Sequence, residues 1–206
     1  MRRSILILAI LLFATSSMAG LDPQKIVYRD GDIIFQTSQS EQSVAIQRAT
    51  RSPYSHCGMI FYRNGKPYVF EASSTARFTP IKKWIARGSG GHFVVRRLKD
   101  AGTILSGKAA TRLRTAAMRF QGKPYDWTFE WSDDRIYCSE LVWKAYDRGL
   151  NIQVGNMQQM KEFNLSDPIV SQKLKERYGT RIPLNEPVIS PEAIYSSDRL
   201  ETVMKK

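Results

Sequence analysis

The chain contains two cysteines and two histidines, and their order along the sequence limits the chemistry that they can do. Cys138 opens a predicted amphipathic helix, where the partial positive charge of the helix N-terminus favours a thiolate over a thiol. A thiolate that attacks a carbonyl group also needs a base and a group that orients this base. Both histidines, His56 and His92, precede Cys138, so the base must come from the N-terminal half of the chain.

His56 begins a predicted β-hairpin. The apolar runs 56–63 and 66–72 flank the pair Asn64-Gly65. Asn-Gly is a strong signal for a two-residue hairpin turn, because both central residues must tolerate positive φ. We therefore expect two antiparallel strands with His56 at the open end of the hairpin.

The turn also sets the register of this hairpin. If Arg63 faces Lys66, then Glu71 lies opposite Gly58 and on the same face as His56, at a diagonal distance of roughly 7–8 Å. A carboxylate in this place can hold the second imidazole nitrogen and fix the tautomer of the ring. The alternative for Glu71 is a solvated charge at the edge of the hairpin.

Cys57 and Cys138 could form a disulfide in an oxidising compartment. Neighbouring side chains of a strand point to opposite faces, so His56 and Cys57 should not both face Cys138. A His56–Cys138 catalytic pair and a Cys57–Cys138 disulfide are thus competing hypotheses. The helix-start position of Cys138 favours catalysis, and we expect Cys57 to be a small buried hydrophobe that points away from Cys138.

The other polar residues do not indicate a further catalytic or metal-binding site. His92 follows a glycine-rich loop and is interpreted as a loop residue, although such a loop could also form a lid. Asp133-Asp134 could bind a cation, but a turn or helix-cap role is favoured. Two histidines without clustered cysteines argue against a structural zinc site, and the chain has neither a phosphate loop nor a G-x-S-x-G elbow. We expect no metal and no cofactor.

The first residues are typical of a targeting segment. Two arginines precede an apolar stretch at 5–13, which ends in an A-x-A-like site at Ala19. We expect 1–19 to be a signal peptide and 20–206 to form a single domain, periplasmic or secreted. No later apolar run has the length of a membrane span, so the mature chain should have no transmembrane segment.

The chain is basic, with a formal net charge of +12. In an exported protein this charge does not indicate nucleic acid as a partner, and anionic lipid headgroups or acidic wall polymers suit it better. A solvated basic surface without a partner is the alternative.

The pattern of elements predicts an α+β fold in which an antiparallel sheet packs against helices, including the helix that begins with Cys138. Periodicity and turn signals define these elements, and Gly149 and Gly179 are expected to lie just after the ends of two helices. The predicted strands are 32–36, 56–63, 66–72 and 93–98, with helices at 43–50, 108–120, 138–148 and 168–178, a helical turn at 81–87 and a further helix start at 190–191.

Two blocks of the chain resemble a known family. The segment Gly122-Lys123-Pro124-Tyr125-Asp126-Trp127 and the run Cys138-Ser139-Glu140-Leu141-Val142 are similar to the nucleophile segment of the NlpC/p60 papain-like cysteine hydrolases. Ser55-His56-Cys57-Gly58-Met59-Ile60, with Phe70-Glu71-Ala72, resembles the histidine hairpin of that family. Because the histidine block comes first here, the chain is similar to the circularly permuted branch and, over nearly its full length, to the YiiX/YebB-like subgroup.

The resemblance implies a circularly permuted papain-like (NlpC/p60) fold and a role for each site residue. It makes Cys138 the nucleophile, His56 the base and Glu71 the third polar group. Tyr125 and the helix-start residue Ser139 are expected to contact the substrate or the oxyanion. The implied activity is that of an exported cysteine hydrolase, of amidase or peptidase type, that cleaves an amide or ester bond.

The substrate is expected in the cell envelope, as a peptidoglycan peptide or an acyl lipid. Two departures from the ordinary family pattern affect the cleft: Glu71 replaces the usual third histidine or amide, and Thr128-Phe129 stands where a Gly-Gly pair is usual. An alternative function is an envelope module that binds a lipid or peptide in a papain-like cleft with little turnover.

Overall fold

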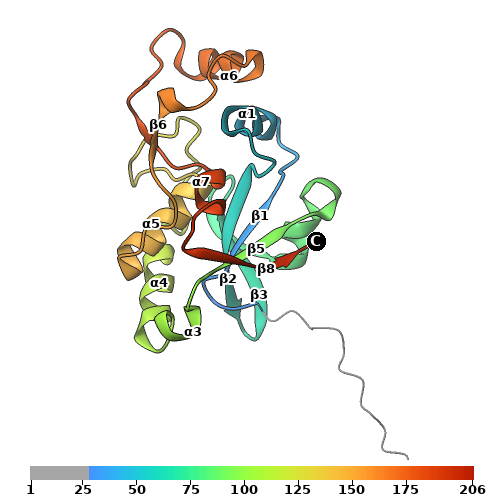
Figure 1. Ribbon diagram of the computed structural model, residues 1–206, viewed down its shortest axis with the longest axis vertical. Helices are drawn as coiled ribbons and strands as arrows, with labels where there is room; N and C mark the ends of the chain where they lie inside the picture. The colour runs from blue at the N-terminus through green and yellow to red at the C-terminus, as the bar shows by residue number, and fades with distance from the viewer. Residues whose placement is uncertain (1–27) are drawn as a thin grey trace, which may run out of the picture.

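A six-stranded antiparallel sheet forms the centre of the computed structural model, which describes residues 28–206 (Figure 1). The strand order is β4-β3-β2-β1-β5-β8. The predicted signal peptide, 1–19, lies outside the described residues. The strands of this sheet are β1 (Ile33–Gln36), β2 (His56–Arg63), β3 (Lys66–Ala72), β4 (Ala76–Pro80), β5 (Val94–Leu98) and β8 (Leu200–Lys205).

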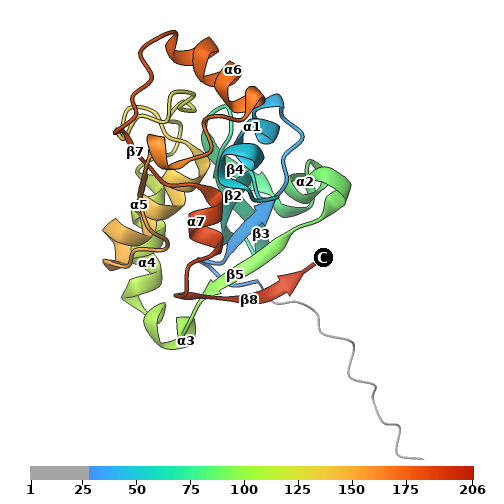
Figure 2. The same cartoon turned by 45° about the horizontal axis from the view of Figure 1, so that its top comes forward.

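Helices cover both faces of the sheet, and α4, α5 and α7 lie together on one side of it (Figures 1 and 2). This arrangement confirms the predicted α+β fold class. A separate two-stranded ladder joins β6 (Gln158–Gln159) to β7 (Pro187–Val188). The α-helices are α1 (Glu41–Thr50), α2 (Ile81–Ala86), α3 (Ala101–Ile104), α4 (Lys108–Met118), α5 (Cys138–Leu150), α6 (Pro168–Tyr178) and α7 (Pro191–Tyr195), with 3-10 turns η1 (Ser89–Gly91) and η2 (Met160–Glu162).

The period-two pattern of β2 gives the sheet two apolar faces. Cys57, Met59 and Phe61 point into the larger core, which α5 completes, whereas Ile60 points into a smaller core with Trp84 of α2. All five side chains are fully shielded from solvent. The start of β2 is therefore held between two packed layers, and its first residue, His56, is positioned by both.

The β2–β3 hairpin has the predicted register. Arg63 pairs with Lys66, and the turn residues Asn64 and Gly65 both have positive φ, at 49° and 71°. Gly58 has no room for a side chain, because a Cβ there would lie 2.5 Å from a methyl group of Val69. The tight contact at Gly58 lets β3 approach β2 next to the functional residues.

The helix ends agree with the sequence in one case and differ in another. The Asp167 side chain caps α6, which ends at Gly179 as predicted. The prediction that Gly149 lies after α5 is wrong: Gly149 lies inside the helix, and Asn151 ends it with φ of 56°. A Cβ at Gly149 would lie 2.8 Å from the Leu113 Cα, so this glycine serves the contact of α5 with α4.

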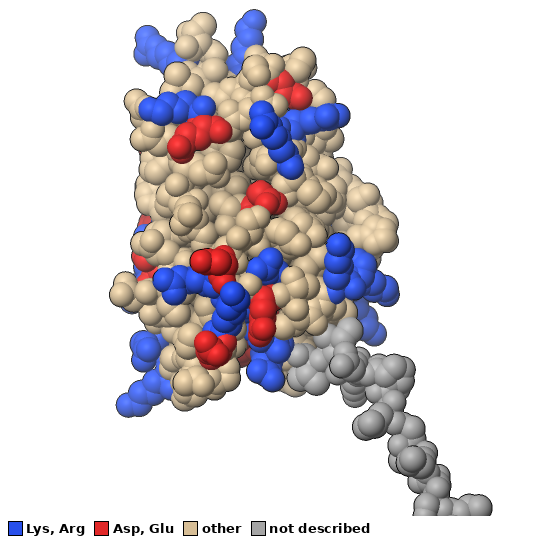
Figure 3. All heavy atoms as spheres, viewed as in Figure 1, with Lys and Arg blue, Asp and Glu red and all other residues tan. Residues whose placement is uncertain are grey.

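Charge is spread over the face that Figure 3 shows. Lys and Arg side chains occur from top to bottom of this face, with Asp and Glu side chains among them. No helix within 28–206 has the length and apolarity that a membrane crossing requires.

Candidate active site

Cys138 is the first residue of α5, and its position follows from the local sequence. Tyr137 precedes it with extended backbone, and the Tyr137 N–H donates to Glu140 Oε2 over 3.3 Å, as in a capping box. The first N–H groups of a helix have no partner within the helix, and the partial positive charge at this end of α5 favours a negative charge on Cys138. The Cys138 side chain is buried, at 2% exposure, and it lines a cavity.

His56 and Glu71 form the pair that the hairpin predicts. The Nε2 atom of His56 lies 2.6 Å from Glu71 Oε2, and the imidazole lies close enough to Cys138 for the cysteine to raise its pKa. Since Nε2 contacts the carboxylate, Nδ1 is the nitrogen that remains for the thiol. The His56 ring stacks on Trp84 at 5.9 Å between centroids, which holds the imidazole plane. The structure thus brings together all three predicted catalytic side chains.

Glu71 is completely buried and has four hydrogen-bonding partners. Besides His56, it accepts from Thr79 Oγ1 over 2.6 Å, from Trp84 Nε1 over 2.9 Å, and from the Arg87 guanidinium. These donors come from β4, α2 and the residue that follows α2. They satisfy both carboxylate oxygens, so Glu71 can remain an anion without access to water.

Cys57 does not point away from Cys138, and this sequence-based expectation was wrong. Both cysteines are free, buried and part of the same core, and Cys57 lies close enough to Cys138 to lower the pKa of its thiol. Alternation along β2 does place Cys57 and His56 on opposite faces. Because His56 is the first residue of β2, its ring reaches Cys138 at the end of the strand while Cys57 contacts it from the face.

The electrostatics favour a thiolate–imidazolium pair. The hydrogen bond from Cys57 and then the charge of His56 lower the pKa of Cys138 well below its usual range, against the opposing effect of burial. Burial by itself would lower the pKa of His56, but the Cys138 thiolate and Glu71 raise it to about 10. Burial likewise opposes ionisation of Glu71, yet His56, Thr79 and Arg87 lower its pKa to about 2. At neutral pH the proton therefore lies on the imidazole.

Tyr125 and Ser139, the predicted substrate or oxyanion contacts, both lie beside Cys138. The buried Tyr125 ring packs on Trp127 with centroids 4.7 Å apart, and burial followed by the charge of Cys138 raises the pKa of its hydroxyl. This hydroxyl is a neutral donor at ordinary pH. The Ser139 hydroxyl donates to the Ile189 carbonyl over 2.8 Å, so only the backbone N–H of Ser139 is available to an oxyanion.

Gln42 is a candidate site residue that the sequence did not indicate. It is buried in α1, and its Nε2 lies 3.4 Å from the Tyr125 hydroxyl. Gln42 and Tyr125 both line the cavity that contains Cys138. A glutamine near the start of an amphipathic helix has the pattern of a surface residue, and only the packing of α1 on α6 reveals its buried position.

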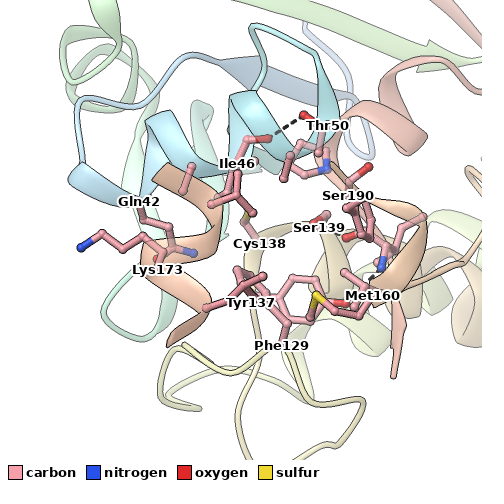
Figure 4. Close-up of a pocket in the computed structure, with 18 of the residues that line it drawn as sticks. Gln42, Ile46, Thr50, Phe129, Tyr137, Cys138, Ser139, Met160, Lys173 and Ser190 are labelled. Carbon is pink, nitrogen blue, oxygen red and sulfur yellow. Dashed lines mark hydrogen bonds between the residues drawn. The ribbon is translucent and has the colours of Figure 1, made fainter. Parts of the chain in front are cut away.

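Two hollows meet at this site. The first, the apolar cavity, is partly open to solvent, and it is lined mainly by apolar side chains of α1, α6 and the segments around η2 and β7. Figure 4 shows Cys138 in it, between Ile46 of α1 and the rings of Tyr137 and Phe129. The second, the polar cleft, is lined by His56 and by polar groups of Gln36, Ser38, Ser55, Ser73 and Arg87, together with the apolar side chains of Ile46, Ala72 and Trp127.

The remaining polar residues lie apart from these hollows. His92 is exposed and lines neither the apolar cavity nor the polar cleft. Asp133 accepts hydrogen bonds from Arg148 and Lys144, and these two cations, Arg148 first, lower its pKa to about 2. Its role in the described residues is an ion pair with α5 rather than a helix cap.

Comparison with known proteins matches nearly the whole chain to one family. The profile of Peptidase C92, described as permuted papain-like amidase enzyme, YaeF/YiiX, matches residues 27–204. The uncharacterised protein YiiX of Escherichia coli (strain K12) is 54% identical over 176 residues, which are 85% of this chain and 86% of the E. coli protein. The crystal structure of YiiX from Escherichia coli O157:H7 is also 54% identical and superposes with a TM-score of 0.83, covering 86% of this chain and 97% of that one.

The E. coli O157:H7 protein is described as a metalloprotein. Among residues 28–206 of the present chain, no group of three or more His, Cys, Asp or Glu side chains could hold a metal ion. The described residues therefore do not fit a metal that needs three such ligands.

Proposed function

The chain belongs to the YaeF/YiiX, or C92, family of permuted papain-like amidases, and on this premise we propose that it is a cysteine hydrolase whose nucleophile is Cys138, with His56 as base and Glu71 as orienting group. One observation carries the proposal: a buried helix-start thiol lies beside an imidazole that a buried carboxylate holds by a hydrogen bond of 2.6 Å. This arrangement is the one that activates a nucleophile in acyl transfer.

The first step forms a thioester. The Cys138 thiolate attacks the carbonyl carbon of an amide or ester, and the carbonyl oxygen becomes an oxyanion. Donors for it are the backbone N–H groups at the start of α5, the Tyr125 hydroxyl and the Gln42 amide, each worth roughly 3–4 kcal/mol if it is well placed. As the carbon–nitrogen or carbon–oxygen bond breaks, the His56 imidazolium protonates the leaving group.

The second step releases the acyl group. Water attacks the thioester carbon while the neutral His56 takes its proton, and cleavage of the carbon–sulfur bond restores the thiolate–imidazolium pair. Glu71 keeps its charge throughout, because its pKa of about 2 lies far below that of the imidazole. It stabilises the imidazolium and aims Nδ1 at the sulfur.

We further propose that the enzyme acts on a cell-envelope substrate after export. The predicted signal peptide and the net charge of +12 support this location, since the bacterial envelope offers anionic surfaces. A fusion of residues 1–27 to a reporter that is active only outside the cytoplasm tests the proposal, and a reporter that stays inactive contradicts it.

Alkylation of Cys138 tests the nucleophile. Iodoacetamide modification, followed by peptide mass spectrometry that separates Cys138 from Cys57, should titrate well below pH 8, whereas a free thiol titrates at about 8.5. A His56→Gln variant should lose the low-pH reactivity. A midpoint for the unmodified protein at or above 8.5 contradicts an activated nucleophile.

Substitution of Cys57 provides a matched pair of controls. Cys57→Ser keeps a side-chain donor next to the sulfur, whereas Cys57→Ala removes it. We expect Cys57→Ala to raise the alkylation midpoint, and Cys57→Ser to stay closer to the unsubstituted protein. Equal midpoints in the two variants would show that a side-chain donor at position 57 does not lower the pKa of Cys138.

A further inference from the structure

Trp127 is an exposed aromatic residue in the lining of the polar cleft. The preceding residue, Asp126, is completely buried, and its Oδ1 atom accepts from the Thr128 N–H over 2.8 Å and from the Thr128 hydroxyl over 2.7 Å. A carboxylate that binds the backbone two residues further on fixes a turn. This turn leaves the Trp127 side chain 53% exposed, more than any other large apolar side chain within 28–206.

The segment that follows β3 lies next to Trp127 and completes this part of the cleft. The Tyr125 N–H donates to the Ser74 carbonyl over 3.0 Å, and this bond holds Ser73 beside the segment that contains Trp127. Ser73 and Trp127 both line the polar cleft. The cleft therefore combines an aromatic ring with hydroxyl and amide groups. The other hydroxyl and amide side chains of the lining are those of Gln36, Ser38, Ser40, Gln42 and Ser55.

Two polar atoms of this lining are buried and have no hydrogen-bonding partner among the described residues. They are the Ser73 hydroxyl and the Oε1 atom of Gln36, a side chain that is 2% exposed. Buried polar groups normally have a partner, because an unmade hydrogen bond costs free energy. An amide oxygen only accepts, whereas a hydroxyl group both donates and accepts. Hydroxyl groups of a ligand would satisfy both atoms.

The charges of the cleft favour a neutral ligand over a cationic one. The lining contains Arg87 and His56 but no carboxylate among its described residues, and Glu71 already binds both of these groups. A neutral ring with several hydroxyl groups fits the hydroxyl and amide lining. The face of an indole ring is negatively polarised, so it attracts the C–H groups on the face of a sugar ring.

We infer that Trp127 and the polar cleft bind a sugar ring, and that the substrate is an amide or ester whose leaving group is an amino sugar or a sugar hydroxyl. This inference rests on the proposed function, and it names the substrate class of that site. His56 lines the polar cleft, whereas Cys138 does not. Because the leaving group is the part that takes the proton from His56, the sugar is assigned to the leaving side.

Amides with a common acyl group test the leaving side. N-acetylglucosamine, N-acetylcyclohexylamine and N-acetylbenzylamine all release acetate, which can be measured with Cys138→Ala as the blank. The cyclohexyl ring has no hydroxyl groups, and the benzyl ring can only stack. We expect kcat/KM for the sugar amide to exceed that of both other amides by about tenfold or more. Equal rates, or a faster cyclohexyl or benzyl amide, would overturn the sugar site while leaving a cysteine hydrolase in place.

Substitutions in the cleft locate the effect. Trp127→Ala should lower kcat/KM for N-acetylglucosamine by about tenfold, and Trp127→Phe, which keeps an aromatic ring, by less than about threefold. Leu184 is also exposed, at 47%, but lies outside the polar cleft, so Leu184→Ala should leave kcat/KM unchanged. The same response to Trp127→Ala and Leu184→Ala would overturn the role of the ring.

Ser73→Ala tests the hydrogen bonds of the same site. The Ser73 hydroxyl has no partner within the described residues, so its removal should leave the urea unfolding curve unchanged. We expect kcat/KM for N-acetylglucosamine to fall by about fivefold and that for N-acetylcyclohexylamine to stay the same. An equal change for both amides would show that Ser73 does not contact the sugar.

Binding to the inactive protein separates this inference from the proposed function. Cys138→Ala can be titrated with N-acetylglucosamine and N-acetylcyclohexylamine by ligand-observed NMR, and this measurement does not depend on turnover. Tighter binding of the sugar amide that Trp127→Ala weakens about tenfold supports the sugar site, even if the active protein hydrolyses none of the amides and the proposed function fails. A sugar amide that binds no better than the cyclohexyl amide, or that binds equally well without Trp127, overturns the sugar site.

Discussion

Two glutamates of this protein are fully buried, yet their surroundings shift their pKa values in opposite directions. Glu71, on β3, has four donors, and its pKa is lowered to about 2. Glu140, in the first turn of α5, has Lys144 at 2.7 Å and the Tyr137 N–H at 3.3 Å, and burial raises its pKa to about 8. Burial alone does not decide the charge of a carboxyl group; the number of donors that replace water does.

This difference separates the carboxylate of the proposed catalytic site from a structural carboxyl group. A fixed anion is needed to stabilise the imidazolium of His56 in every step of the proposed mechanism. The Glu140 side chain accepts the Tyr137 N–H and lies beside the Lys144 ammonium group, and a neutral carboxyl group or an amide still supplies an oxygen there. The same substitution at the two positions should therefore have very different effects.

The largest effect is expected for Glu71→Gln. The amide would place an N–H group against one of the donors that now surround the carboxylate, and the imidazolium would lose its counter-charge. We expect kcat/KM to fall by about 100-fold or more, with about 3–5 kcal/mol lower unfolding free energy. Glu140→Gln, the matched control, should change kcat/KM less than about threefold. Similar losses in both variants would contradict the distinction.

The pH dependence of stability should separate the two glutamates by sign. The folded pKa of Glu71 lies below its ordinary value of 4.5, so its contribution is present above about pH 4.5 and is lost as the pH falls towards 2. The folded pKa of Glu140 lies above 4.5, so its contribution is present below pH 4.5 and is lost as the pH rises through 8. Urea unfolding of Glu71→Gln should show a flatter acid limb, and that of Glu140→Gln a flatter limb between pH 4.5 and 8. If Glu71→Gln instead flattened the limb between pH 4.5 and 8, and Glu140→Gln the acid limb, the hydrogen-bond donors around each glutamate would not control its charge.

The half of the site that depends on local sequence could be predicted. The Asn64-Gly65 turn sets the register of the hairpin, and this register places His56 beside Glu71. Helix periodicity likewise placed Cys138 at a helix start. These features depend on neighbouring residues and on the period of a strand or helix, and they are visible in a single sequence.

The other half depends on contacts between distant segments. Thr79, Trp84 and Arg87 meet Glu71 only because β4 and α2 fold back next to β3, and none of them has a motif. The alternation rule gave the correct face for Cys57, but it could not show that α5 packs on this face and puts Cys138 beside it. Gln42 was missed for the same reason, because its burial comes from packing between helices.

Removal of the cationic partner should destabilise the protein more at Glu140 than at Glu71. This is the reverse of the order expected when the glutamates themselves are substituted. Lys144 is 2% exposed and contacts Glu140, Asp133 and the Ser132 carbonyl, so Lys144→Met should cost about 2 kcal/mol of unfolding free energy. Arg87 has a 42% exposed side chain, and Arg87→Met leaves Glu71 three donors, so its cost should be about 1 kcal/mol or less. Urea unfolding at neutral pH measures both. A larger cost for Arg87→Met would mean that the guanidinium, and not the neutral donors, keeps Glu71 ionised.

A similarly small effect is expected for Thr79→Val, which removes one neutral donor from Glu71 without changing the size of the side chain. The remaining partners include the imidazolium of His56 and the Arg87 guanidinium, so Glu71 should stay ionised at neutral pH. We expect about 1 kcal/mol lower unfolding free energy and a change in kcat/KM of less than about threefold. The acid limb of stability should move towards higher pH, because Thr79 is one of the groups that lower the pKa of Glu71. An unchanged acid limb would show that the charged partners alone set the pKa of Glu71. The difference in pKa between Glu71 and Glu140 would then follow from the kind of donor rather than from the number of donors.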